Sequence, residues 1–357
     1  MKRLLATLVK IGISVAIIGY LVWQARQDDA FTILRDQPKR WGMLVIAWLF
    51  CAGAVLTTIV RWHFLVRALE IPSRLRNSLR IGFLGYMFNL APLGLLGGDA
   101  IKVVMLAREH KNTKSKSIAS VVVDRLIGLY MLFVVAAIAI LVTGFWRAEN
   151  ATDKAAIANI CLATFLAAVV GTLGIGALMI PAVSDGKLVR AIERLPRLGH
   201  PIKSLIDALR MYRRRPGVLL AAALMSVIVH SCFATGIYFI ASGLFTNVHS
   251  LGDHLVMSPL SMATGVLPLP FGPFEWVLND LYAWVRAGGV IIPGGQGFVV
   301  ALGYRVITVL IAAIGAGYYI GARQELAQSI QQADEDESAV VGPTIAMTEK
   351  CQSASAA

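Results

Sequence analysis

Two stretches, PLGLLGGD at 92–99 and PLPFGPFE at 268–275, interrupt long apolar runs and decide the fold. Each begins with a proline and ends, seven residues later, in a carboxylate. Proline removes a helical hydrogen-bond donor and glycine weakens a helix, so neither 81–107 nor 255–292 is expected to form one unbroken helix. Irregular backbone at membrane depth must be covered by protein or face a wet cavity. The two stretches therefore predict re-entrant helical hairpins.

The rest of the chain is apolar enough to require a membrane. Of its 357 residues 57% are hydrophobic and 15% are charged, against about 25% charged in soluble domains. Apolar runs of roughly bilayer length lie at 5–24, 42–60, 118–145, 156–182, 217–243 and 296–321. The predicted fold is an all-α polytopic membrane protein with six full spans and two re-entrant Pro/Gly-broken hairpins.

The basic residues predict the orientation. The connecting segments on one side of this topology carry 21 Lys and Arg, and those on the other side carry six. The basic side comprises 1–4, 61–80, 102–117 and 183–216, and the other side comprises 25–41, 146–155 and 244–254. Because cytoplasmic loops are enriched in Lys and Arg, both termini are predicted to be cytoplasmic in a bacterial inner membrane. Segment 183–216 is either amphipathic, lying on the anionic leaflet, or a solvated loop.

The order span, span, hairpin, span occurs twice, and three spans per half invert the second half relative to the first. The predicted units are a first repeat at 1–145, an external loop at 146–155, a second repeat at 156–325 and a disordered cytosolic tail at 326–357. Inverted repeats with broken helices are typical of alternating-access transporters. The predicted hairpin-backbone residues are Asn89, Pro92, Gly94, Gly97, Gly98, Pro268, Pro270 and Gly272.

Six ionisable side chains are predicted at or near membrane depth. They are Asp99, Lys102, Asp124, Arg125, Glu275 and Arg305. A charge at the centre of a membrane helix costs about 2.5–3.5 kcal/mol, so these groups must be paired, neutralised or hydrated. They predict a binding site for a polar ligand, because arginine donates to phosphate in a fork and carboxylates hold cations or relay protons. The alternative is purely structural pairing, in which Asp99 or Asp124 neutralises Arg125 and Glu275 neutralises Arg305.

Asp124 and Arg125 are neighbours in the chain, so on a helix they point about 100° apart. One is expected to face a cavity while the other supports a hairpin. Arg125 lies roughly 10 Å inside its span, and snorkelling to lipid phosphates is an alternative for it. Asp99 and Glu275 are predicted to approach a shared midplane cavity that holds Arg125 or Arg305.

Other features of the sequence say less about function. The cysteines are widely spaced and predict no metal site, no cofactor is expected, and the scattered basic residues do not predict a nucleic-acid partner. His230 is interpreted as a core histidine and His254 as a surface residue. Four tryptophans near span ends predict an interfacial belt, namely Trp23, Trp41, Trp62 and Trp146.

The chain resembles the membrane domain of lysylphosphatidylglycerol synthases and its stand-alone, flippase-like relatives. The resemblance rests on FNLAPLGLLGGDAIKVVMLAR at 88–108, SIASVVVDRLIGLY at 117–130, PLPFGPFE at 268–275 and YRVITVL at 304–310. It implies movement of a lipid head group between leaflets, with Asp99, Asp124, Arg125, Glu275 and Arg305 in or beside the head-group cavity. Pro273 and Phe274 depart from the glycine and small residues of the relatives.

No aminoacyl-transferase domain is expected after the last span, so we do not expect this chain to synthesise an aminoacyl lipid or to act as an enzyme. The expected partners are the membrane and a phospholipid or lipid-linked substrate, with a homo-oligomer possible. A membrane-embedded lipid-modifying enzyme and a small amine or ion transporter remain alternative functions.

Overall fold

Long apolar helices form the frame of the protein in the computed structural model. The structure describes residues 2–89, 95–110, 112–147, 151–180, 207–208, 210–267, 269 and 271–320. Within these residues, five helices are long and apolar enough to cross a membrane. They are α3 (Trp41–Ala68), α6 (Lys114–Thr143), α7 (Lys154–Met179), α11 (Pro216–Leu244) and the C-terminal helix Gln296–Ile320. Each coincides with a predicted span.

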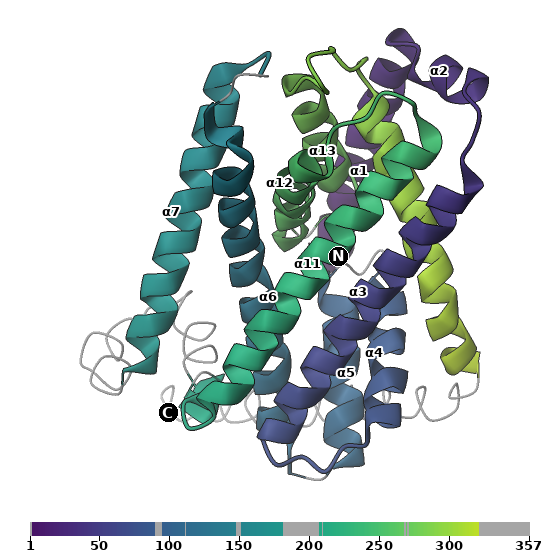
Figure 1. Cartoon of the computed structure of the whole chain (residues 1–357). Coiled ribbons are helices and arrows are strands. Elements are labelled where there is room, and N and C mark those ends of the chain that lie inside the picture. Colours follow the sequence, from purple (N-terminus) through teal and green to yellow (C-terminus); the bar gives the residue numbers. More distant parts are fainter. Residues whose placement is uncertain are drawn as a thin grey trace, which may run out of the picture.

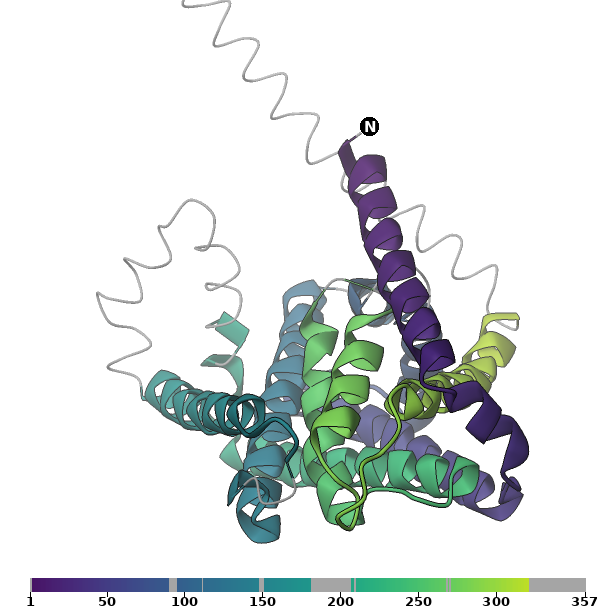
Figure 2. The same cartoon turned by 90° about the horizontal axis from the view of Figure 1, so that it is seen from above.

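The first predicted span, 5–24, falls within a helix of its own, α1 (Lys2–Gln27), which is followed by the short α2 (Ala30–Asp36). In Figure 1 α1 is partly hidden behind other helices, whereas Figure 2 shows it lengthwise and projecting away from them. It is therefore inclined to the long helices α6 and α7. α1 is not among the five helices above, so a sixth full span stays a prediction.

Both predicted hairpins are pairs of short helices. The first consists of α4 (Leu75–Asn89) and α5 (Leu95–Glu109). The second consists of α12 (Leu251–Ala263), a turn of 3₁₀ helix at Thr264–Val266, and α13 (Pro273–Trp284). None exceeds 15 residues, about 22 Å, so each is too short to cross a bilayer that needs about 20 residues.

The two hairpins occupy opposite ends of the molecule: α4 and α5 lie in the lower half of Figure 1, and α12 and α13 lie in the upper half. This placement agrees with the predicted inversion, although the inverted repeat and the re-entrant depth remain predictions. Some predicted features lie outside the described residues. These are Pro92, Gly94, Pro268, Pro270, most of the basic segment 183–216, and the tail.

Glycine allows the arms of the first hairpin to touch. A Cβ at position 98 would overlap the carbonyl oxygen of Gly85 and the amide of Asn89. The Gly98 N–H donates a hydrogen bond of 3.2 Å to Asn89 Oδ1, which ties the start of α5 to the end of α4. Two of the predicted hairpin-backbone residues, Asn89 and Gly98, thus make the contact that closes the hairpin.

Two apolar cores hold the hairpins. The lower core surrounds the first hairpin and includes Leu84 of α4, Leu106 of α5 and Trp62 of α3. The upper core surrounds the second hairpin and includes Leu278 of α13 and Ile240 of α11. Each hairpin is therefore anchored against the long helices by its own packed core.

Two sequence-based interpretations are wrong. Trp62 is fully buried and its indole N–H donates to Ser120 Oγ at 3.2 Å, because α3 continues beyond the predicted span end into the lower core. Trp23, Trp41 and Trp146 are exposed as an interfacial belt requires.

His254, interpreted as a surface residue, is fully buried. Its ring contacts Ser250 O at 2.8 Å and Tyr282 Oη at 2.6 Å, because the start of α12 packs against α13. Its neighbour His249 lies on the connection between α11 and α12, where burial lowers the pKa of the imidazole below its usual range. His249 is thus expected to be neutral at pH 7.

Candidate functional site

An arginine–carboxylate pair lies at the break of the first hairpin. Asp99, the fifth residue of α5, accepts two hydrogen bonds from Arg125 of α6, at 2.6 Å from Nε and 2.9 Å from Nη2. This is the bidentate fork that arginine forms with carboxylates. The Asp99 side chain is 13% exposed, whereas the Arg125 side chain is 40% exposed. The pair is therefore covered on its acidic side and open on its basic side.

Lys102 stands one helical turn after Asp99 on α5 and belongs to the same cluster. Its Nζ lies 3.8 Å from Asp99 Oδ1 and 5.5 Å from the centre of the Trp62 ring. The carbon stem of Lys102 runs over Gly85 of α4, where a larger residue would crowd it. The side chain is only 9% exposed, so the first hairpin holds a buried ammonium group.

A second arginine–carboxylate pair lies at the break of the second hairpin. Arg305 Nε of the C-terminal helix donates to Glu275 Oε1 at 2.5 Å. The other oxygen of Glu275 accepts the backbone N–H of Gly272 at 2.8 Å, so the carboxylate also caps the start of α13. Gly272 has a φ of +108°, a backbone conformation that favours glycine. Glu275 is 1% exposed and Arg305 is 24% exposed.

Aromatic rings flank this second guanidinium. The Cζ atom of Arg305 lies 5.1 Å from the ring centre of Phe271 and 5.5 Å from that of Phe274. Cation–π contacts of this kind stabilise an arginine in apolar surroundings. Phe274, one of the departures from the family pattern, thus supports the arginine directly.

A third pair, which sequence reasoning missed, lies between α3 and α6. Arg61 Nε donates to Asp124 Oδ1 at 2.8 Å, and Arg61 Nη1 donates to Ser226 Oγ of α11 at 2.6 Å. The side chains of Arg61 and Asp124 are 5% and 4% exposed. Gly128 leaves room for the guanidinium, since a Cβ there would lie 3.3 Å from Arg61 Nη2. This pair is enclosed by three long helices.

The predicted span ended at residue 60, which placed Arg61 in a loop, whereas α3 runs to Ala68. The available signal was a single arginine inside TTIVRWHFLV at 57–66, a stretch that has no other Lys, Arg, Asp or Glu. His230, interpreted as a core histidine, is buried beside this pair and its Nε2 contacts Gly128 O at 2.9 Å. That interpretation agrees with the structure.

The structure brings the predicted site residues together in separate groups. Asp99, Lys102 and Arg125 form one group, and Glu275 and Arg305 form another. Asp124 turns away from its neighbour Arg125 and pairs with Arg61, as the divergence of adjacent helical residues requires. Arg125 pairs with Asp99, and contact of its exposed side with lipid phosphates stays a prediction. A shared cavity, and a ligand-binding role for these residues, remain predictions.

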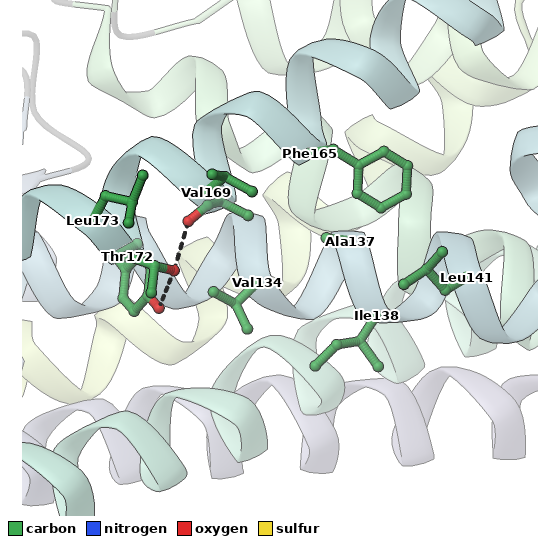
Figure 3. A pocket seen from close by; sticks show the side chains of 10 residues that line it. Val134, Ala137, Ile138, Leu141, Phe165, Val169, Thr172 and Leu173 are labelled. Atoms are coloured by element: carbon green, nitrogen blue, oxygen red, sulfur yellow. Dashed lines mark hydrogen bonds between the residues drawn. The ribbon is translucent and has the colours of Figure 1, made fainter. Parts of the chain in front are cut away.

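An apolar groove of about 350 Å³ lies elsewhere, between α6 and α7. Its lining includes Val134 and Ile138 of α6 and Phe165 and Val169 of α7, as Figure 3 shows. Two polar contacts lie in the lining: the Tyr130 hydroxyl meets Thr172 Oγ1 at 2.8 Å, and Thr172 Oγ1 donates to Ala168 O at 2.7 Å. The lining is almost wholly apolar, and none of the six predicted site residues contributes to it.

Comparison with known proteins agrees with a membrane protein. A family model described as the lysylphosphatidylglycerol synthase TM region matches residues 7–315, which include the three arginine–carboxylate pairs described above. A stretch of 129 residues is 29% identical to a UPF0104 membrane protein of Pyrococcus horikoshii. That match covers 36% of this chain and 37% of the relative, just over a third of the length of each.

Proposed function

The chain belongs to the family of lysylphosphatidylglycerol synthase transmembrane regions, and from this we propose that it moves a lipid or lipid-linked head group between the two leaflets of a membrane. One observation carries the proposal. A partly exposed arginine, held by a buried carboxylate, lies at the break of each of two hairpins at opposite ends of the molecule. The two arginines lie on long helices, α6 and Gln296–Ile320, and the broken helices supply the buried carboxylates that hold them.

The contrast with the Arg61–Asp124 pair supports a role in transport for the Asp99–Arg125 and Glu275–Arg305 pairs. Arg61 and Asp124 are both at least 95% covered, as expected for charges that only join helices. Arg125 and Arg305 each expose a substantial part of the guanidinium side chain. Exposed arginines can exchange part of their contact with a carboxylate for contact with a head group, whereas the covered pair cannot be reached without separating α3 from α6.

We also propose that the chain is not itself an enzyme. Both oxygens of Asp99 accept bonds from Arg125, and both oxygens of Glu275 accept bonds from Arg305 and Gly272. A general base needs an available oxygen near the proton that it removes. We further propose that the protein lies in a bacterial inner membrane with both termini in the cytoplasm, and that it can form a homo-oligomer.

Exchange of labelled lipids tests the proposed function. In liposomes that contain head-group-labelled phospholipids, the purified protein is expected to accelerate exchange between leaflets. Asp99→Asn and Glu275→Gln should each slow that exchange at least about tenfold, because each removes the negative charge that holds an arginine at the hairpin break. A tenfold change in rate corresponds to about 1.4 kcal/mol in the activation free energy. Initial exchange rates at equal reconstituted protein give the comparison.

Asp36→Asn, an exposed acidic residue at the end of α2, is the matched control and should leave exchange unchanged. Mass spectrometry of the same lipids separates transport from catalysis. Unchanged exchange over a panel of anionic, zwitterionic and cationic lipids would contradict the proposal, and a new covalent lipid species would indicate an enzyme.

A further inference from the structure

The first hairpin carries more positive charge than its carboxylates neutralise. Asp99 faces both Arg125 and Lys102, so one carboxylate serves two cations. The neighbouring Arg61–Asp124 pair, close enough to act electrostatically on Lys102, is balanced. Among the described residues of this cluster, three cations therefore accompany two carboxylates.

Lys102 is the cation of this cluster that has only a long ion pair with Asp99 and a contact with the Trp62 ring among the described residues. An ammonium group has three donors, yet Lys102 Nζ forms no hydrogen bond with any residue that the structure describes, and its distance to Asp99 Oδ1 is 3.8 Å. Its side chain is nine-tenths buried, so water reaches it poorly. A buried charge without hydrogen bonds is unfavourable and calls for a counter-charge.

The second hairpin differs in this respect. One carboxylate, Glu275, accompanies one cation, Arg305, and the N–H at the start of α13 is already capped by Glu275. The first hairpin also has a helix start at its break, because α5 begins at Leu95, and the positive end of that helix adds to the excess. Among the described ion-pair residues at the two breaks, positive charge is thus in excess at the first hairpin and balanced at the second.

We propose that the first hairpin binds an anionic phosphate group, with Lys102 supplying the compensating charge and Arg125 the exposed donors. This inference rests on the proposed function and names the charge class of its substrate: a head group whose phosphate is not neutralised by an ammonium of its own. The excess charge selects for the anion, and the forked guanidinium orients it. The balanced second hairpin contributes no such selection.

Substitution of Lys102 tests the charge assignment. The full-length protein is placed in nanodiscs that contain phosphatidylglycerol or phosphatidylcholine, and bound lipid is measured by native mass spectrometry. The wild type is expected to prefer phosphatidylglycerol, and Lys102→Met should lower that preference roughly tenfold, about the effect of 1.4 kcal/mol. Lys102→Arg should retain it. Lys114→Met, which removes an exposed lysine at the start of α6, is the matched control and should also retain it.

The folded state provides a second readout. Methionine fills the volume of the lysine stem and removes a buried charge, so Lys102→Met is expected to unfold at a temperature no lower than the wild type. Inorganic phosphate added to the same nanodiscs identifies the source of the anion: displacement of lipid indicates that soluble phosphate also binds, and no displacement indicates that lipid alone is accepted. Both results support the inference when the preference depends on Lys102.

Two results would overturn the inferred phosphate site. One is equal binding of the two lipids by the wild type. The other is an unchanged preference for phosphatidylglycerol in Lys102→Met, which would mean that the Lys102 amine is neutral in the folded protein. The exchange assay separates this failure from that of the proposed function. If the protein exchanges lipids but shows no charge preference, the proposed translocation is supported and the phosphate site is contradicted. If binding depends on Lys102 but no lipid exchange occurs, the phosphate site is supported and the proposed translocation is contradicted.

Discussion

Arg61→Met is expected to destabilise the protein by about 3–5 kcal/mol, the largest effect that we expect of any single substitution. The substitution leaves the carboxylate of Asp124, which is 4% exposed, buried without its cation. It also removes the bond from Arg61 Nη1 to Ser226 Oγ, although Ser226 keeps its own bond to Ala222 O at 2.7 Å. Reversible unfolding in mixed micelles would measure the loss.

The double variant Arg61→Met/Asp124→Leu tests whether this ion pair only stabilises the packing of α3 on α6 or also takes part in transport. Replacing both charges by apolar groups of similar size is often neutral or stabilising, so the double variant should recover most of the lost stability. Arg67→Met, at an exposed position six residues further along α3, should change stability by less than about 0.5 kcal/mol. If the double variant is stable but inactive in lipid exchange, the third pair takes part in transport and is misassigned as structural.

The pairing of Arg61 also illustrates what the sequence could and could not predict. Hydropathy locates the long helices to within a few residues at most ends, but the apolar run at 42–60 ends before Arg61, whereas α3 continues to Ala68. In the folded protein Ser120 and Asp124 on α6 provide partners for Trp62 and Arg61. A polar group is accommodated inside such a helix only when a distant segment supplies its partner, and hydropathy contains no such information.

The hairpins were more predictable, because the cause lies within the local sequence. Proline and glycine interrupt both apolar stretches, and the structure has paired short helices there. The structural alternative left Asp99 and Asp124 open as partners of Arg125. The helical angle between Asp124 and Arg125 predicted that these two would diverge, but it did not choose between the two acids. That choice depends on the rotation of α6 against α5, which is set by packing over the entire lower core.

Gly98→Ala is expected to have the second-largest effect, because it acts on the backbone contact that closes the first hairpin. The added methyl group would overlap Gly85 O and the Asn89 amide, and a backbone carbonyl cannot rotate aside as a side chain can. Overpacking usually costs about 1–3 kcal/mol, and we expect a loss near 3 kcal/mol here. Since α5 must move, Asp99 is drawn away from Arg125 and lipid exchange should fall as well. Unfolding in micelles and the exchange assay measure the two effects.

Gly53→Ala is the matched control for this substitution. Gly53 lies within α3, and a Cβ there would meet no atom within 4 Å. Alanine favours a helix over glycine by up to about 1 kcal/mol, so this variant should be as stable as the wild type or more so. Equal stability and equal exchange in Gly98→Ala and Gly53→Ala would show that α4 and α5 do not pack through Gly85 and Gly98. The position of Asp99 against Arg125, and with it the phosphate site at Lys102, would then lose its structural support.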